Sequence, residues 1–230
     1  MNMGLTIHYK LSVTKHLSSA VVQELVSRTA LYARKIGCAE VSEPVRAASD
    51  GNLAPLFVQV GKPEDGCFGN VAPKCGWLVE VWPGEGCESA LFGLCQYPRW
   101  ILSRHGKVPT GYDEGWLLKE SCKTQYAAER GWEHFLICHK RMVSLLDFWR
   151  QLGGAVEVSD EGGYWETRDE KKLRSSLERY DGLVAAVAGV FKDRADDSGS
   201  DHSIESPIFA RKDFERLEAE GRREFARHFS

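Results

Sequence analysis

The side chains with the most chemical potential are concentrated in the middle of this sequence. All seven Trp fall between Trp77 and Trp165, and six of the seven Cys fall between Cys67 and Cys138. Thiolates bind metals or act as nucleophiles, and indole rings stack on flat or cationic ligands. We therefore expect any functional site to lie in the Trp-, Cys- and Gly-rich region 77–165.

Four of the cysteines occur in two similar stretches. Cys67 is followed by Cys75, and Cys87 by Cys95, with seven residues between the members of each pair and a Pro-x-acid-Gly sequence before the first. Four thiolates would form a zinc site, although structural zinc sites commonly use spacings of two to four residues within each pair. The alternative is a pair of similar strand–turn–strand units with small buried thiols.

One histidine lies on the inward face of the clearest predicted helix. A helical wheel places His139 between Phe135 and Met142, and a buried imidazole needs hydrogen-bond partners. A backbone carbonyl would satisfy it structurally, whereas a carboxylate, a metal or a ligand would make it a general acid or base. On the same helix His134 and Cys138 are four residues apart, close enough to share a metal.

Two acidic clusters are candidate partners for this histidine. Glu85 and Glu88 flank Cys87 in a Gly/Pro-rich loop, and Asp160 with Glu161 follows a predicted strand. Loops at strand ends often carry active-site carboxylates, but Asp and Gly also favour ordinary turns. If the chain is an enzyme, these residues indicate a metal-assisted hydrolase in which His139, Asp160 and Glu161 are catalytic.

A ligand-binding site is the competing hypothesis. Trp82 and Trp165, together with Glu85 and Glu88, could line a concave site for a sugar-like or cationic ligand. Most of the tryptophans also fit positions that periodicity places inside, so core packing is the alternative explanation for them.

Composition and missing motifs exclude several classes. The net charge is −3, and Lys and Arg do not cluster among the tryptophans, which disfavours nucleic-acid binding. The sequence lacks a P-loop, G-x-G-x-x-G, H-E-x-x-H, G-x-S-x-G and C-x-x-C. No stretch approaches the roughly 18 apolar residues of a membrane span, and the first residues lack the order of a secretory signal. We expect a cytoplasmic protein with reduced cysteines and no membrane partner.

Hydrophobic periodicity predicts an α+β fold. Leu5–Val13 alternates as a half-buried strand, and further strands are expected at Val41–Arg46, Leu56–Val60, Trp77–Trp82, Ser89–Pro98, Trp100–His105 and Ala155–Ser159, with Tyr164–Glu166 as a returning hairpin. Helices are expected over about 15–36, 132–152 and 169–192, and a shorter one over Trp116–Ala128. They would pack a mixed or mostly antiparallel sheet.

The length of 230 residues fits one domain with an appendage or two small domains. We predict a single domain over residues 1–192, a polar linker over 193–206 and a peripheral C-terminal helix over 207–230. That helix would dock on its own chain or on a partner.

Three functions emerge from the sequence. The favoured one is a module that binds a small molecule or a protein through region 77–165. The alternative is a metal-assisted hydrolase or other small enzyme that uses His139 with Glu85, Glu88, Asp160 and Glu161. The third is a structural zinc protein, with zinc as the cofactor bound by Cys67, Cys75, Cys87 and Cys95.

Overall fold

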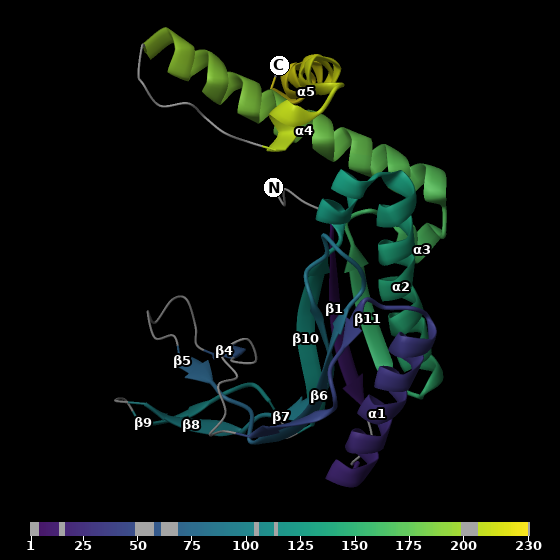
Figure 1. Ribbon diagram of the computed structural model, residues 1–230. Helices are drawn as coiled ribbons and strands as arrows, with labels where there is room; N and C mark the ends of the chain where they lie inside the picture. Colours follow the sequence, from purple (N-terminus) through teal and green to yellow (C-terminus); the bar gives the residue numbers. More distant parts are fainter. Residues whose placement is uncertain are drawn as a thin grey trace. The chain divides into compact units, whose positions relative to one another are not determined.

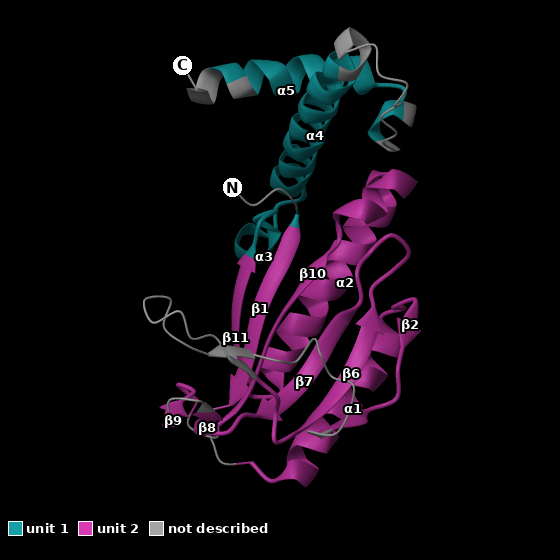
Figure 2. Ribbon diagram, turned by 90° about the vertical axis from the view of Figure 1, so that its left-hand side faces the viewer, with its two compact units in different colours: residues 1–5, 160–230 teal, residues 6–159 magenta. Residues whose placement is uncertain are grey.

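The computed structural model of the chain describes residues 5–13, 17–48, 58–60, 69–103, 106–112, 115–198 and 207–229. These residues form two compact units, one of residues 6–159 and one of residues 160–230 with residues 1–5 (Figure 2). The first unit holds a sheet with two long helices, and the second is helical. The predicted α+β class is thereby confirmed.

The larger unit is built on a seven-stranded sheet. Its strands follow the order β11-β1-β10-β7-β6-β2. Strand β3 also pairs with β6, along the first half of β6, whereas β2 pairs with its last two residues. The registers of β1 with β10, β10 with β7, and β6 with β7, β2 and β3 are all antiparallel. The bounds of the strands are β1 Thr6–Val13, β2 Glu40–Val41, β3 Val45–Ala48, β6 Cys75–Trp82, β7 Ala90–Gln96, β10 Trp116–Lys123 and β11 Ala155–Asp160.

Alternating side chains explain the strand at the start of the chain. Ile7 and Leu11 are fully buried, whereas His8 between them is exposed. Residues that pair directly across an antiparallel ladder share a face, and Leu11 lies opposite Leu118 of β10. The strand predicted at Leu5–Val13 is therefore confirmed, with its apolar face in the core.

Two long helices, α1 (Ser19–Lys35) and α2 (Trp132–Gln151), run along the same side of this sheet (Figure 1). The side chain of Ser18 accepts a hydrogen bond from the amide of Val21 and caps the start of α1. The rings of Tyr32 in α1 and Phe148 in α2 stack with centroids 4.1 Å apart. These two helices match the predicted helices over 15–36 and 132–152.

Apolar side chains from both helices and the sheet form the core. The indole of Trp149 is 1% exposed, and Phe135 on the same helix is fully buried. Their volume fills the layer between α2 and the sheet, as the broad apolar face of this helix predicts.

Two small hairpins complete the larger unit. β4 (Val58–Val60) pairs with β5 (Gly69–Val71), and β8 (Trp100–Ser103) pairs with β9 (Gly106–Pro109), both antiparallel. Of the strand predicted at Leu56–Val60, Leu56 and Phe57 lie outside the described residues.

The helix predicted at Trp116–Ala128 is wrong. Residues Trp116–Lys123 form β10, which pairs with β1 over its whole length, and a 3-10 helix, η3 (Gln125–Arg130), follows. Leu, Lys and Glu in this segment favour a helix intrinsically. Burial of Trp116, Leu118 and Cys122 on one face of the sheet overrides that preference.

The hairpin predicted at Tyr164–Glu166 is also wrong, because a short helix, α3 (Tyr164–Thr167), occupies it. Three further segments complete the helical unit: α4 (Glu170–Ser198), η4 (Pro207–Ala210) and α5 (Phe214–Phe229). Helix α4 extends six residues into the segment predicted as a linker from residue 193. The predicted domain limits at 192 and 206 stay a prediction.

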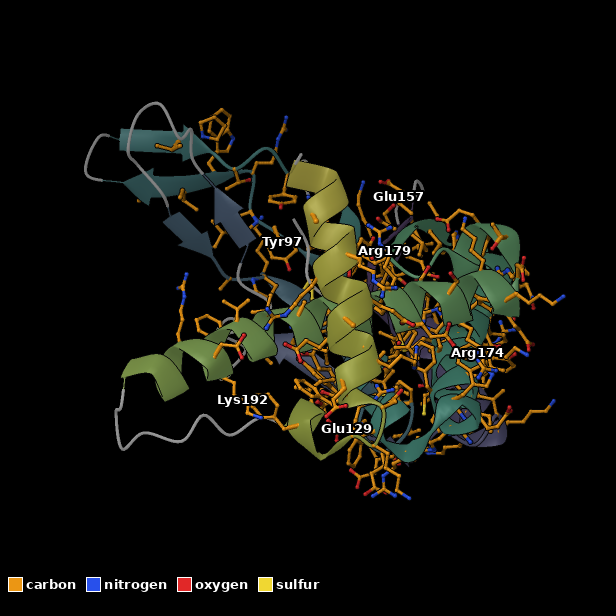
Figure 3. All side chains as sticks on the ribbon, turned by 90° about the horizontal axis from the view of Figure 1, so that it is seen from above. Tyr97, Glu129, Glu157, Arg174, Arg179 and Lys192 are labelled. Atoms are coloured by element: carbon orange, nitrogen blue, oxygen red, sulfur yellow. The ribbon has the colours of Figure 1, made fainter. Side chains whose placement is uncertain are left out.

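The C-terminal helix α5 packs on α4 of the same chain, which is the first of the two alternatives expected for it. The helices approach closely because Gly182 and Gly221 face each other, and a Cβ at Gly221 would overlap the carbonyl of Gly182. Arg179 of α4, labelled in Figure 3, forms an ion pair with Glu224 of α5 that flanks the contact. In the part of the chain that the structure describes, no helix is long and apolar enough to cross a membrane.

The close contact of the glycines gives a first prediction. Alanine is a better helix former than glycine by about 1 kcal/mol, yet the Gly221→Ala methyl group has no room beside Gly182. We expect this substitution to lower the free energy of unfolding of the helical unit by about 1–3 kcal/mol. Hydrogen exchange of the α5 amides would measure it, with the exposed Ala219→Ser as the control. Slower exchange in Gly221→Ala would contradict the packing described.

Candidate functional site

The turn that joins β6 to β7, Pro83–Ser89, lies in close contact with the rest of the larger unit. Gly86 has φ +83°, a conformation that favours glycine, and a Cβ there would lie 2.9 Å from the Cα of Ala127 in η3. The amide of Cys87 donates to the carbonyl of Gly84 (3.1 Å). The indole Nε1 of Trp82 donates to the carbonyl of Cys87 (2.8 Å). The turn is thus fixed at both its tip and its base.

A cavity of about 660 Å³, open to solvent, lies beside this turn, at the edge where β2 meets β6. Its size is in the range of sites for small ligands. In the register of β2 with β6, Glu40 lies opposite Trp82, so their side chains share a face of the sheet. Glu80, two residues before Trp82, lies on that face too. The cavity is lined by Glu40, Val41, Ser42, Glu80, Trp82, Cys87 and Ser89.

The charges around the cavity are negative. Glu40 and Glu80 are exposed, and among the described residues neither carboxylate makes an ion pair. The guanidinium of Arg34 binds the carboxylate of Glu43 (2.6 Å) and the carbonyl of Ser42 (3.2 Å), which lines the cavity. Its charge is therefore already matched by a carboxylate that does not line the cavity.

Behind the cavity wall, the thiols of Cys87 and of Cys138 on α2 influence each other's acidity. The Sγ of Cys138 is fully buried and occupies the space that a Cβ of Gly84 would take. Nε2 of His134 lies 3.7 Å from that sulfur and 2.8 Å from the carbonyl oxygen of Glu85. A carbonyl oxygen only accepts, so Nε2 carries a proton and also faces the sulfur.

Several groups act on the acidity of this thiol. The pKa of Cys138 is lowered to about 7. The interaction with Cys87 is the largest cause, and burial of the thiol opposes it. The charges of His134 and Arg141 lower it further. The guanidinium of Arg141 is held by the carbonyls of Pro83 (2.8 Å) and Ile36 (3.3 Å). The interaction with Cys138 and burial raise the pKa of Cys87.

Two further thiols lie near this pair and stay protonated. Burial raises the pKa of Cys38 to about 11 and raises that of Cys122 further. The Cys122 thiol donates to the carbonyl of Glu88 (3.3 Å). We call Cys38, Cys87, Cys122 and Cys138 the thiol cluster. In it, the pKa of Cys138 is lowered, whereas those of Cys38, Cys87 and Cys122 are raised.

The acidic residues predicted beside Cys87 bind basic groups of the chain. Glu85 forms an ion pair with Arg130 of η3. Glu88 accepts from the amide of Lys123 (3.1 Å) and lies 3.5 Å from its ammonium nitrogen. Both carboxylates anchor the turn to neighbouring elements. Neither lines the cavity, whereas Trp82, predicted with them as a ligand-binding residue, does.

The predicted general base, His139, is fully buried in the core. Its Nδ1 lies 2.9 Å from the hydroxyl of Thr124, and its ring centroid lies 5.5 Å from that of Phe135. The Thr124 hydroxyl is neither the backbone carbonyl nor the carboxylate that were the two expected kinds of partner. The catalytic role of His139 stays a prediction.

Asp160, Glu161 and Trp165 belong to the helical unit. The carboxylate of Asp160 accepts hydrogen bonds of 2.8 Å from the amides of Gly162, Tyr164 and Trp165. It therefore satisfies the unpaired amides at the start of α3. The guanidinium carbon of Arg168 lies 4.7 Å from the centre of the Trp165 ring.

Of the predicted zinc ligands that the structure describes, Cys75 and Cys95 lie apart from Cys87. Cys75 lies at the start of β6 and Cys95 near the end of β7, at the far end of this hairpin from Cys87. Seven residues of extended strand separate the two ends by about 20 Å. Cys67 lies outside the described residues. In the described part of the chain, no group of three His, Cys, Asp or Glu side chains is suited to hold a metal.

Sequence reasoning missed the residues that β2 brings to the cavity. Glu40 and Ser42 meet Trp82 only through the pairing of β2 with β6, which joins distant parts of the sequence. The four-residue spacing of His134 and Cys138 did reveal that these two side chains are neighbours. Their partner Cys87, however, comes from a different element.

Compared with known protein families, curated proteins and solved structures, the chain matches none.

The position of His134 leads to a second prediction. The His134→Ala substitution removes a charge that lowers the pKa of Cys138, so the pKa should rise above about 7. The ultraviolet absorbance of the thiolate as a function of pH measures this midpoint. Cys138→Ala, which should abolish the transition, assigns it. An unchanged midpoint in His134→Ala would show that the histidine does not act on this sulfur.

Proposed function

We propose that the chain is a binding module that takes a small organic cation, such as a quaternary ammonium or a guanidinium compound, into the cavity between β2, β6 and the Pro83–Ser89 turn. The observation that carries this proposal is the composition of the lining. One indole and two carboxylates face a cavity of about 660 Å³, and its lining among the described residues includes no Lys or Arg.

The indole of Trp82 favours such a ligand. A cation near the face of an indole ring is attracted by about 0.5–1 kcal/mol at exposed sites and by more when water is excluded. Trp82 is half-buried, and its Nε1 is held by the carbonyl of Cys87. Its ring is therefore oriented before a ligand arrives, which lowers the entropic cost of binding.

The two carboxylates supply the charge that a cation would complement. Glu40 and Glu80 lie on the same face at the edge of the sheet. Neither carboxylate forms an ion pair with another described residue of the chain. An exposed ion pair contributes about 0.2–1 kcal/mol and weakens with added salt. The site would thus bind weakly and depend on ionic strength.

The hydrolase remains the second hypothesis from the sequence. No observation of this structure favours it over the binding module, because His139 contacts Thr124 in the core and Glu85 and Glu88 contact basic groups.

Binding of tetramethylammonium, measured by isothermal titration calorimetry, tests the proposed function. We expect Glu40→Gln and Glu80→Gln each to weaken the affinity about two- to fivefold, because each removes one exposed charge pair. Glu129→Gln is the matched control, since Glu129 is exposed in η3 and does not line the cavity. Neutral tert-butyl alcohol should bind more weakly than the cation. Equal binding of both compounds, or no effect of either substitution, would contradict the proposal.

A further inference from the structure

The hairpin of β8 and β9 carries exposed apolar side chains. Leu102 is 89% exposed and Trp100 is 45% exposed. In the register of the hairpin, Trp100 lies opposite Pro109 and Leu102 lies opposite Lys107, so these four side chains share one face. The two strands contact chiefly each other. Exposed apolar patches with polar rims mark interaction sites.

The charge of this hairpin is positive, in contrast to the net charge of −3 of the whole chain. Arg99, directly before β8, and Lys107 in β9 are both exposed. Neither is paired with a carboxylate in the described part of the chain. The sequence from Tyr97 to Tyr112 contains no Asp or Glu. This surface therefore complements a partner with negative charge.

We propose that the β8–β9 hairpin binds the surface of a membrane that contains anionic lipids. Trp100 and Leu102 enter the boundary between headgroups and acyl chains, and Arg99 and Lys107 lie at the lipid phosphates. The sequence predicts no membrane partner because it lacks an apolar span, whereas a peripheral contact of this kind needs none. The contact is separate from the cavity and does not rest on the proposed function.

The types of the side chains fit a lipid interface. Trp is enriched where hydrocarbon meets headgroups, because its ring is apolar and carries one N–H donor. The ammonium nitrogen of Lys107 lies 5.2 Å from the centre of the Trp100 ring, so an apolar group and a cation lie side by side. The aliphatic stem of a lysine can follow apolar surface while its charge stays in water. Leu102 would leave water by entering the acyl chains.

The base of the hairpin is anchored in the larger unit. The amide of Thr110 donates to the carbonyl of Arg99 (2.9 Å), and its hydroxyl donates to the carbonyl of Pro98. Tyr97, buried directly after β7, has its ring 5.1 Å from that of Tyr112. The conformation at the base is thus set before the hairpin meets a membrane, which lowers the entropic cost of binding.

Single-stranded nucleic acid is the competing partner, because cations beside an exposed Trp can also bind phosphates and stack a base. Two features favour the membrane. Lys107 already lies over the ring of Trp100. Leu102 is the more exposed of the two apolar side chains, and it has no aromatic ring on which a base could stack.

Sedimentation of the full chain with lipid vesicles tests the proposal. We expect the chain to sediment with vesicles of phosphatidylcholine and phosphatidylserine, and much less with vesicles of phosphatidylcholine alone. Added salt should release it, because salt screens the attraction between the cations and the lipids. Equal binding to both kinds of vesicle, or binding to neither, would overturn the proposal. Binding of a single-stranded oligothymidylate in place of the vesicles, measured by fluorescence anisotropy, would also overturn it.

Variants of the hairpin assign the contact. Lys107→Gln should weaken the affinity for the anionic vesicles about fivefold, because it removes one cation near the surface. Leu102→Ser should weaken it about tenfold, because it removes the apolar group that enters the interface. Lys35→Gln and Leu31→Ser are the matched controls, since both residues are exposed on α1. Hairpin variants that bind the vesicles as tightly as these controls would contradict the assignment.

Discussion

The close approach of the β6–β7 turn to η3 and α2 is the constraint on which the site depends. It is possible because Gly84 and Gly86 have no side chains where the turn meets Cys138 and Ala127. A larger residue at either position would push the turn away from α2. The absence of two Cβ atoms thus brings a sheet turn and a helix, from separate parts of the chain, within contact of each other.

Two different chemical environments result on the two sides of one turn. On the outer side, Trp82 and the carboxylates of β2 and β6 line an acidic cavity. On the inner side, Cys138 lies among cationic and hydrogen-bonding groups that favour its thiolate. Cys87 belongs to both, because it lines the cavity and also lowers the pKa of Cys138.

The sequence predicted the elements whose local pattern agrees with their final environment. The alternation of β1 and the apolar face of α2 are examples, because burial on one face produces the pattern directly. β10 was mistaken for a helix because its residues favour one intrinsically, and only pairing with β1 makes it a strand. In the site, Trp82 and the region around Cys87 were predicted. Glu40 and Ser42 were not, since strand pairing between distant segments leaves no mark in the local sequence.

The central claim is that the Pro83–Ser89 turn and the adjoining sheet edge form the functional site of this chain. Nuclear magnetic resonance of the ¹⁵N-labelled protein during addition of tetramethylammonium tests it most directly. We predict shifts of the Trp82 indole N–H and of the amides of Ser42 and Ser89, while the buried indole of Trp149 stays unchanged. Shifts confined to other residues, or no shifts, would contradict the account.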